Sequence, residues 1–274
     1  MIDLHTHSRA SDGTLSPAEL VSLAAARGVT LLSLTDHDCL DGMAEARAAC
    51  ATAGIRFLPG VEVSTSWDGK TLHIVGLGVD PENTALKAGL ARLQAVRDAR
   101  GAEIGKRLEA KGIVGAYAGA ARIADEARLT RTHYARFLLE AGHVKDLQQA
   151  YRRYLGRGKP GHVSVEWASL EETLDWIHAA GGRAVLAHPL RYGFTRAWLT
   201  KILTAFKQAG GDALEVISGR SNPDEIAVSA HLAARFELMG SVGSDFHAPT
   251  QWLQPGVETP LPAGVKPVWE SLSA

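Results

Sequence analysis

Two pairs of candidate metal ligands, one near each end of the chain, restrict what this sequence can fold into. His5 and His7 follow apolar residues at the N-terminus, and Asp245 and His247 follow another apolar run near the C-terminus. Residues i and i+2 of a strand point to the same side, so each pair can present two ligands to one ion. Such a pair can also lie on a solvent-exposed strand edge without any metal. Because both ends carry one, we expect a closed fold in which the first and last strands meet.

The length and charge exclude several classes of protein. The chain has 274 residues, of which 46% are hydrophobic, enough for one large domain with a small insertion. Its formal net charge is -1, so no overall positive field favours long duplex nucleic acid or an anionic membrane. Cys39 and Cys50 are too few for a disulfide framework or a thiolate zinc site. With a strand expected at the N-terminus and no apolar run of roughly 18 residues, we expect a cytoplasmic protein without leader or membrane span.

Strand-like and helix-like segments alternate over most of the sequence. Ser16-Pro17-Ala18-Glu19 is a capping box that opens a helix ending near Gly28, and the apolar run 31–34 follows it. A helix over about 41–53 and a strand over 57–64 come next. Similar strands precede His188 and Asp245 in the second half. This rhythm predicts parallel strands with helices outside them and polar residues where the strands end, as in barrel active sites.

A β-hairpin is predicted around Asp68-Gly69, a dipeptide typical of two-residue turns. With the turn centred there, Ser64 pairs with His73, and Glu62 and His73 lie diagonally on one face, within reach of a shared ion. A solvated hairpin face is the alternative. The alternation of these two residues with Val, Leu and Ile favours side chains that point inward.

The segment 84–161 has helical periodicity and no strand pattern. We therefore predict two parts, a barrel domain formed by residues 1–83 and 162–274 and a helical insertion or cap formed by residues 84–161. The basic glycine loop at 156–161 is either a linker or an anion-binding lip.

Nine candidate ligands lie at or just past the ends of apolar runs, a distribution that favours a metal centre over separate core or turn polar groups. They are His5, His7, Asp12, His37, Glu62, His73, His188, Asp245 and His247. Imidazole and carboxylate ligands without thiolate favour Mn, Fe, Zn or Mg, and the number of ligands predicts two or three ions. Asp36 and His37 cannot both point inward from a regular strand, so we assign ligation to His37 and a supporting hydrogen bond to Asp36.

The ordered set of motifs resembles the polymerase and histidinol phosphatase (PHP) superfamily. The matching segments are His5-Thr6-His7, Thr35-Asp36-His37, Gly60-Val61-Glu62, His188-Pro189 and Ser244-Asp245-Phe246-His247. The resemblance implies an α/β fold, a distorted (β/α)7 barrel with a trinuclear site at its mouth. It also implies three ligand sets: His5, His7, Glu62 and Asp245 for one ion; Asp12, His37 and His247 for a second; Glu62, His73 and His133 for a third. Mn2+ is the first expectation, with Zn2+, Fe2+ and Mg2+ as alternatives.

Within the superfamily the chain is most similar to small bacterial members with a helical insertion, which act on 3',5'-bisphosphonucleotides or trim short RNA from its 5' end. The resemblance implies metal-dependent phosphoester hydrolysis by a hydroxide shared between two ions, with a small nucleotide or short oligoribonucleotide as substrate. Catalytic roles fall on His188, as leaving-group acid or phosphate ligand, and on Asp36. Substrate contacts are expected from Ser8, Arg9, Arg131, Lys159 and Arg191, for which ordinary surface positions are the alternative.

Three other functions stay open at this point. A histidinol-phosphate phosphatase often has histidine where this chain has Asp12, which weighs against that substrate. A metal-dependent amidohydrolase also opens with His-x-His, but it should have a bridging lysine and no His247 after the final aspartate. A non-catalytic PHP scaffold module should have lost ligands, whereas every ligand position here is occupied.

Overall fold

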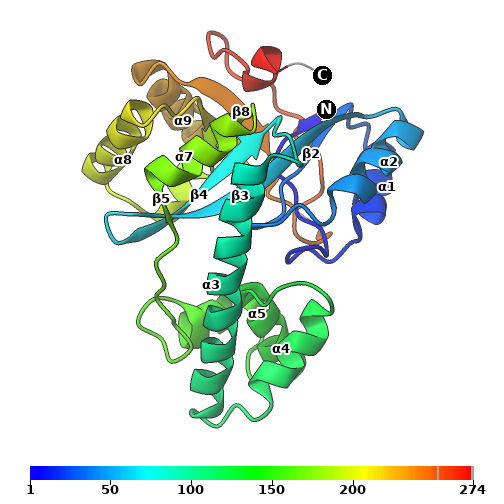
Figure 1. The fold of residues 1–274 in the computed structure, drawn as a ribbon, viewed down its shortest axis with the longest axis vertical. Coiled ribbons are helices and arrows are strands. Elements are labelled where there is room, and N and C mark those ends of the chain that lie inside the picture. The colour runs from blue at the N-terminus through cyan, green and yellow to red at the C-terminus, as the bar shows by residue number, and fades with distance from the viewer. Residues whose placement is uncertain (252, 273–274) are drawn as a thin grey trace.

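The computed structural model describes residues 1–251 and 253–272 and shows a strand-rich upper part above a group of helices (Figure 1). The long helix α3 (Thr84–Glu109) runs from one part to the other. The N-terminus and the last 3-10 turn, η3 (Val268–Ser271), lie at the top of the barrel part in this view, far from the helical part. Except for His133 on α5 (Arg131–Glu140), the residues predicted to hold metal belong to the barrel, which the helices approach from one end.

The sheet of the described residues is a barrel of seven strands with an eighth strand paired at its side. The strands are β1 (Ile2–Asp3), β2 (Leu31–Leu34), β3 (Arg56–Trp67), β4 (Lys70–Leu77), β5 (Ala168–Ser169), β6 (Arg183–Leu186), β7 (Ala213–Ser218) and β8 (Met239–Gly243). Their order is β1-β2-β3-β4-β6-β7-β8, with β5 on β3, and β4 is antiparallel to both of its neighbours. The Leu4 N–H donates to Val242 O (3.0 Å) and the Asp245 N–H to His5 O (2.9 Å). These bonds join the two end segments of the barrel, which confirms the closed fold expected from the terminal pairs and the (β/α)7 barrel implied by the resemblance.

In the described part of the chain, five α-helices cover the outside of the barrel. They are α1 (Pro17–Ala26), α2 (Met43–Ala53), α7 (Leu170–Ala179), α8 (Arg196–Gln208) and α9 (Pro223–Arg235), with short 3-10 turns at Pro189–Tyr192 (η2) and Val268–Ser271 (η3). The predicted capping box of Ser16 and Glu19 is present, and α2 begins at Met43, two residues later than expected. Apolar faces of these helices and the strands form the main core, which includes Leu174, Phe206 and Val216.

The predicted hairpin forms with the predicted register. Ser64 lies opposite His73 and Glu62 opposite Val75 across β3 and β4. Asp68 and Gly69 both adopt positive φ (46° and 67°), the conformation that a tight two-residue hairpin turn requires. The pairing places Glu62 and His73 on one face, with His73 Nδ1 3.0 Å from Glu62 Oε1.

The helical part consists of α3, α4 (Ala116–Ala124), α5 (Arg131–Glu140), α6 (Leu147–Ala150) and a π-helical turn, η1 (Tyr151–Leu155). It has its own apolar cluster, which includes Ile104, Leu108 and Tyr134. Leu86 and Leu90, on the first turns of α3, pack instead in the barrel core. One helix therefore contributes to both cores, and the division at residues 84 and 161 stays a prediction.

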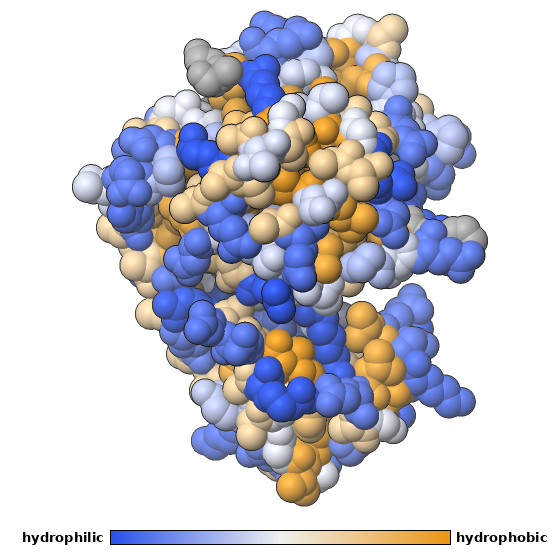
Figure 2. All heavy atoms as spheres, turned by 90° about the vertical axis from the view of Figure 1, so that its right-hand side faces the viewer, coloured by the Kyte–Doolittle hydropathy of each residue, from blue (hydrophilic) through white to orange (hydrophobic). Residues whose placement is uncertain are grey.

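Among the described residues, no helix combines the length and the apolar character needed to cross a membrane. The molecular surface is hollowed where the barrel meets the helical part, and hydrophilic residues gather around that junction (Figure 2).

Candidate metal centre and substrate cavities

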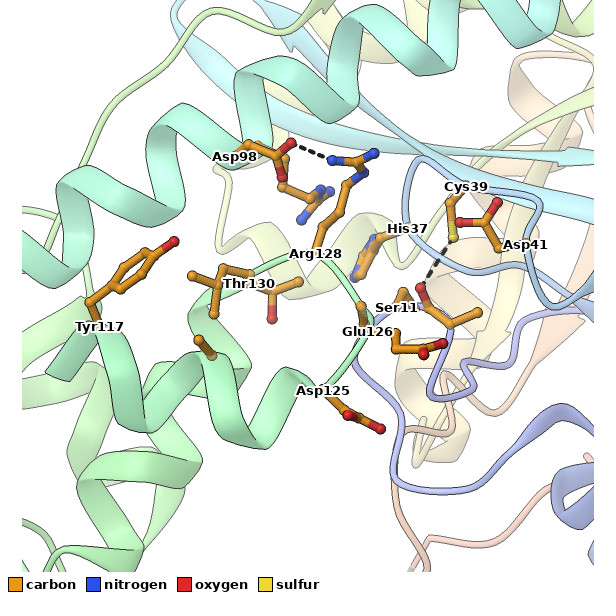
Figure 3. Close-up of a pocket in the computed structure, with 15 residues that line it drawn as sticks. Ser11, His37, Cys39, Asp41, Asp98, Tyr117, Asp125, Glu126, Arg128 and Thr130 are labelled. Carbon is orange, nitrogen blue, oxygen red and sulfur yellow. Dashed lines mark hydrogen bonds and ion pairs between the residues drawn. The ribbon is translucent and has the colours of Figure 1, made fainter. Parts of the chain in front are cut away.

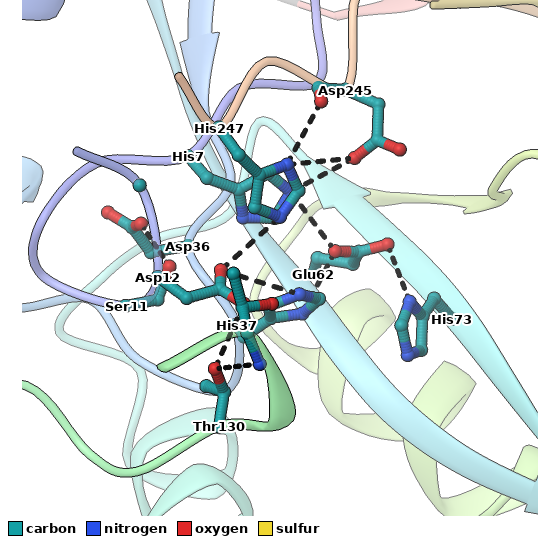
Figure 4. Close-up of polar contacts among 12 residues, drawn as sticks. His7, Ser11, Asp12, Asp36, His37, Glu62, His73, Thr130, Asp245 and His247 are labelled. Atoms are coloured by element: carbon teal, nitrogen blue, oxygen red, sulfur yellow. Dashed lines mark hydrogen bonds and ion pairs between the residues drawn. The ribbon is translucent and has the colours of Figure 1, made fainter. Parts of the chain in front are cut away.

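Eight predicted ligands converge at one end of the barrel, where strands from both halves of the chain end, and all of them except His5 are labelled in Figure 4. Short segments after β1, β2 and β8 carry four of the five histidines, and β3 and β4 carry Glu62 and His73. We call this set the histidine–carboxylate cluster: His5, His7, Asp12, His37, Glu62, His73, Asp245 and His247. The structure thus brings together residues up to 242 positions apart in the sequence, from His5 to His247.

The cluster contains three groups whose ligand atoms lie within 4.8 Å of one another. The groups are His5, His7 and Asp245; His7, Asp12, His37 and His247; and His37, Glu62 and His73. They overlap the three expected ligand sets but differ from them: Glu62 is absent from the first group and His133 from the third, whereas His7 joins the second and His37 the third. The chain therefore carries candidate metal-binding sites, and the assignment of single ligands to single ions stays a prediction.

The donor atoms of the cluster fit metal ions better than they fit one another. His5 Nε2 lies 3.2 Å from Glu62 Oε1, and His7 Nε2 lies 3.3 Å from Glu62 Oε2. Yet His5 Nε2, His7 Nε2 and Glu62 Oε2 are buried without a hydrogen-bond partner in the described part of the chain. Buried polar atoms are rarely left without partners. The ligand atoms of each group lie close enough to bind one ion, and all of them are imidazole nitrogens or carboxylate oxygens. Mn2+, Fe2+ and Zn2+ prefer ligands of these kinds.

The electrostatics of the cluster reflect close packing of buried acids and imidazoles. Burial alone would lower the pKa of His7, but the nearby carboxylates of Asp245 (3.5 Å from Nε2) and Glu62 (3.3 Å) raise it to about 9. Burial raises the pKa of Glu62, but the charges of His5, His73 and His37 outweigh it and hold that pKa well below its usual range. By contrast, burial lowers the pKa of His37 to about 4 despite Glu62 and Asp12. The carboxylates are therefore ionised and ready to bind cations at neutral pH.

Asp36 turns away from the cluster, as predicted from its position next to His37. Its carboxylate accepts hydrogen bonds from Ser8 N–H (2.8 Å), Ser8 Oγ (2.6 Å) and Ser11 Oγ (2.5 Å). These bonds fix the loop that follows His7 against the segment that carries His37. The hydroxyl of Ser8 is thereby engaged inside the protein, and its expected role as a substrate contact stays a prediction.

Glu215 is a supporting residue that the sequence reasoning missed. Its Oε1 lies 3.0 Å from His5 Nδ1, and its Oε2 accepts the backbone N–H of His188 at 2.6 Å. The sequence did contain a signal, because a carboxylate within the buried apolar run Leu214-Glu215-Val216-Ile217 needs a polar partner.

His188 and His133 lie beside the cluster but in none of its three groups. His188 adopts a positive φ of 31°, and its Nε2 is 3.1 Å from Glu62 Oε1. Burial would lower the pKa of His188, but the hydrogen bond and charge of Glu62 raise it. His133 is buried at the start of α5, where its Nδ1 accepts the backbone N–H of Thr130 (3.1 Å). The structure does not gather His133 with Glu62 and His73, and its ligation stays a prediction.

A basic cavity of about 160 Å³ opens beside His37 and His73. Its walls include Arg100 and Arg131, and neither guanidinium pairs with a carboxylate in the described part of the chain. Burial and the nearby charge of Arg131 lower the pKa of Arg100 to about 9. Tyr151 lies under Arg131, with 5.8 Å from Cζ to the ring centroid. We call this space the basic cavity; it suits a phosphate with an attached base. Arg100 was not predicted.

A second hollow near His37, of about 370 Å³, has the opposite character (Figure 3). It lies between the loop after β2 and the helical part, and its walls carry Asp41, Asp125 and Glu126. Arg128 also lines it but forms an ion pair with Asp98. Carboxylates repel phosphate, so electrostatics assigns a phosphorylated substrate to the basic cavity instead.

The other predicted substrate contacts do not line the basic cavity. Arg9 is exposed and pairs with Glu19 at 3.3 Å, and Lys159 is exposed on the loop after η1. Arg191 is held by Ser218, with its Nη2 2.8 Å from the carbonyl oxygen, beside His188. Of the five predicted contacts only Arg131 lines the basic cavity, and phosphate binding by the other four stays a prediction.

Comparison with known proteins agrees with this geometry. The PHP domain matches residues 3–216. The chain is 49% identical to the 3',5'-nucleoside bisphosphate phosphatase of Chromobacterium violaceum, over 100% of this chain and 96% of that protein. It is 47% identical to a 5'-3' exoribonuclease of Haemophilus influenzae, over 98% of this chain and 97% of that protein. A solved Chromobacterium violaceum structure with bound sulfate, described as an amidohydrolase, superposes with a TM-score of 0.95 at 49% identity, over 98% of this chain and 95% of that one.

Proposed function

This chain belongs to the PHP domain family, and on that premise we propose that it is a metal-dependent phosphoesterase. Its proposed substrates are 3',5'-bisphosphonucleotides, converted to nucleoside 5'-monophosphates, and short 5'-phosphorylated RNA, trimmed from the 5' end. The observation that carries the proposal is the basic cavity, which opens directly beside the histidine–carboxylate cluster. A phosphate there and a phosphoester at the cluster can belong to one small nucleotide. The names of two relatives, a bisphosphate phosphatase and a 5'-3' exoribonuclease, support the same substrates.

Two or three divalent ions would be held by the histidine–carboxylate cluster, with Mn2+ as the first candidate because the donors are imidazole and carboxylate. When bound, such ions act as Lewis acids on the phosphoryl group and lower the pKa of water. Glu215 fixes the ring of His5, and Asp36 fixes the loop that follows His7. These bonds hold the ligands in position before substrate arrives.

The remaining residues bind and orient the substrate. Arg100 and Arg131 are placed to hold the phosphate that is not hydrolysed through forked hydrogen bonds. The negative charge of that phosphate would also offset the repulsion between the two guanidinium groups. His188, next to Glu62, has a raised pKa and can donate a proton to the departing oxygen. A phosphate monoester without a second phosphate leaves the basic cavity unfilled, so the geometry favours bisphosphates over monophosphates.

The alternatives have less support. An amidohydrolase of the kind considered above would bury a bridging lysine, and no lysine is buried in the described part of this chain. Asp12, which lies in the second ligand group, differs from the histidine expected in a histidinol-phosphate phosphatase. A scaffold module has no need for Arg100 and Arg131 side by side without counter-charges.

We also propose that long duplex nucleic acid and membranes are not partners, because the net charge is -1 and the basic groups are local. The cytoplasmic location expected from the sequence stays a prediction.

A phosphate-release assay at pH 7.5 with Mn2+ tests the proposal. It compares adenosine 3',5'-bisphosphate, AMP, histidinol phosphate and a 5'-phosphorylated RNA pentamer, with released mononucleotides identified by chromatography. The proposal expects rapid turnover of the bisphosphate, slow turnover of AMP, and stepwise release of mononucleotides from the RNA. A preference for histidinol phosphate, or no turnover of any of the four by metal-loaded protein, would contradict it.

A further inference from the structure

Another cavity adjoins the candidate metal centre next to His188. It is separate from both the basic cavity and the acidic hollow near His37. Its volume is about 430 Å³, and its walls come from η2, the end of β7 and the start of α9. We call it the Ser218 cavity; the lining residues that matter here are His188, Arg191, Glu215, Ser218, Arg220 and Glu225. The proposed hydrolysis of a mononucleotide uses only His188 and Glu215 of this set.

The hydroxyl of Ser218 is the first sign that a ligand binds in this cavity. Ser218 is only 4% exposed, and its Oγ has no hydrogen-bond partner in the described part of the chain. The backbone of the same residue is fully used, because its N–H donates to Ser221 Oγ (3.1 Å) and its carbonyl accepts from Arg191 (2.8 Å). A buried hydroxyl on a cavity wall without a protein partner is a site where a ligand can complete the hydrogen bonding.

Arg191 is fixed over the same wall. A Cβ atom at Gly219 would lie 2.7 Å from Arg191 Nη2, and Gly219 has a positive φ of 53°, so this close approach depends on glycine. One Nη2–H is used by Ser218 O, and no carboxylate pairs with Arg191 among the described residues. The rest of the guanidinium fork is available to an oxyanion.

The other polar groups that border the cavity are engaged within the protein. The helix α9 begins at Pro223, and a capping box of Asn222 and Glu225 closes its N-terminus. The two acids on the wall are also occupied: Glu215 accepts from His188 and contacts His5, and Glu225 accepts the backbone N–H of Asn222 at 2.8 Å. The donors left for a ligand are Arg191 and the Ser218 hydroxyl.

We propose that the Ser218 cavity binds the phosphate that follows the scissile phosphodiester in an oligoribonucleotide. The inference rests on the proposed function, in which the basic cavity holds the 5'-phosphate and the cluster holds the scissile one. A bisphosphonucleotide has no further phosphate, whereas an RNA strand continues past the cluster and needs a second anion site. The Ser218 cavity therefore determines how well the chain acts on RNA rather than on mononucleotides.

The test uses two RNA dinucleotides that differ by one phosphate. Both carry a 5'-phosphate, and only one carries a phosphate on its terminal 3' oxygen. We measure kcat/KM from the initial loss of each intact dinucleotide, because both products of the dinucleotide without the 3'-phosphate and a later product of the other are nucleoside monophosphates. The ratio of the two values cancels general effects on folding or metal content. In the unmodified protein the ratio should be about 10, the value of one charge-assisted hydrogen-bonded contact. In Arg191→Gln it should fall to about 1, and Ser218→Ala, which breaks no internal bond, should lower it in part.

Arg196→Gln is the matched control, because it removes the same charge from an exposed position at the start of α8 that does not line this cavity. Its ratio should equal that of the unmodified protein. A ratio of about 1 in the unmodified protein, or a ratio that Arg191→Gln and Ser218→Ala both leave unchanged, would overturn the inference. Turnover of adenosine 3',5'-bisphosphate by the unmodified protein distinguishes failure of this inference from failure of the proposed function. If the protein turns over the bisphosphate, only the RNA site is refuted. If it does not, the proposed function fails as well.

Discussion

Replacement of Glu215 by glutamine tests how the ligating histidines are held. The Glu215 side chain is buried, and each of its oxygens has one partner: His5 Nδ1 at 3.0 Å and the backbone N–H of His188 at 2.6 Å. A carboxylate can only accept hydrogen bonds, so it keeps the proton of neutral His5 on Nδ1. The lone pair on Nε2 then faces Glu62 and Asp245, where a metal ion is expected.

Glutamine keeps the size of the side chain but has only one acceptor oxygen. If that oxygen stays on the His188 N–H, the amide NH2 meets His5 Nδ1 and favours the tautomer with its proton on Nε2. Loss of such a supporting partner typically lowers metal affinity by about 10- to 100-fold, or about 1.4 to 2.7 kcal/mol. We expect a fall of this size in Glu215→Gln, because His5 is buried and its ring has no alternative partner on that side.

Calorimetric titration of chelator-treated protein with Mn2+ measures this effect. Glu166→Gln is the control, since it removes a carboxylate from an exposed position. Equal Mn2+ affinity in Glu215→Gln and the unmodified protein would refute the reasoning. So would an equally large fall in Glu166→Gln, because that would show a general charge effect.

Three further predictions concern stability, protons and substrate binding. Arg97→Met leaves the carboxylate of Asp38 buried without its ion-pair partner, and urea denaturation should show a loss of about 3 to 5 kcal/mol; a loss below 1 kcal/mol would contradict this. In the metal-free protein the pKa of His7 is raised to about 9, whereas it is about 6.5 in the unfolded chain. Protonated His7 therefore stabilises the fold most below pH 6.5, and this contribution disappears as the pH rises through 9. Mn2+ must displace this proton, so affinity should rise with pH up to about 9 and calorimetry in buffers of different ionisation enthalpy should detect proton release; no release at pH 7 would refute it. Arg131→Gln should raise KM for adenosine 3',5'-bisphosphate by about tenfold or more, and an unchanged KM would remove Arg131 from the phosphate site.

The sequence predicted the site best where local geometry determined it. The spacing of His5 and His7, the Asp-Gly hairpin and the adjacency of Asp36 and His37 each follow from strand periodicity. The structure confirms the hairpin register and the opposite directions of Asp36 and His37. The resemblance to the PHP superfamily was needed to propose His133, because a histidine on a helix of the insertion has no periodic signal.

Contacts across the fold could not be predicted in the same way. Arg100 belongs to a long helix dense in charged residues, and only the packing of α3 against the segment 162–167 places it in the basic cavity. Arg9 was expected to contact substrate, but it pairs with Glu19 on the surface. The difference depends on tertiary burial, which decides whether an arginine is left without a carboxylate partner.

Metal dependence of turnover tests the central claim most directly. Protein treated with a chelator and then dialysed is titrated with Mn2+, and phosphate release from adenosine 3',5'-bisphosphate is followed at pH 7.5. We expect no turnover before metal is added and a rise to a plateau at two or three ions per chain, the number proposed for the three ligand groups of the histidine–carboxylate cluster. Full turnover by the chelated protein, with no response to Mn2+, would contradict the account.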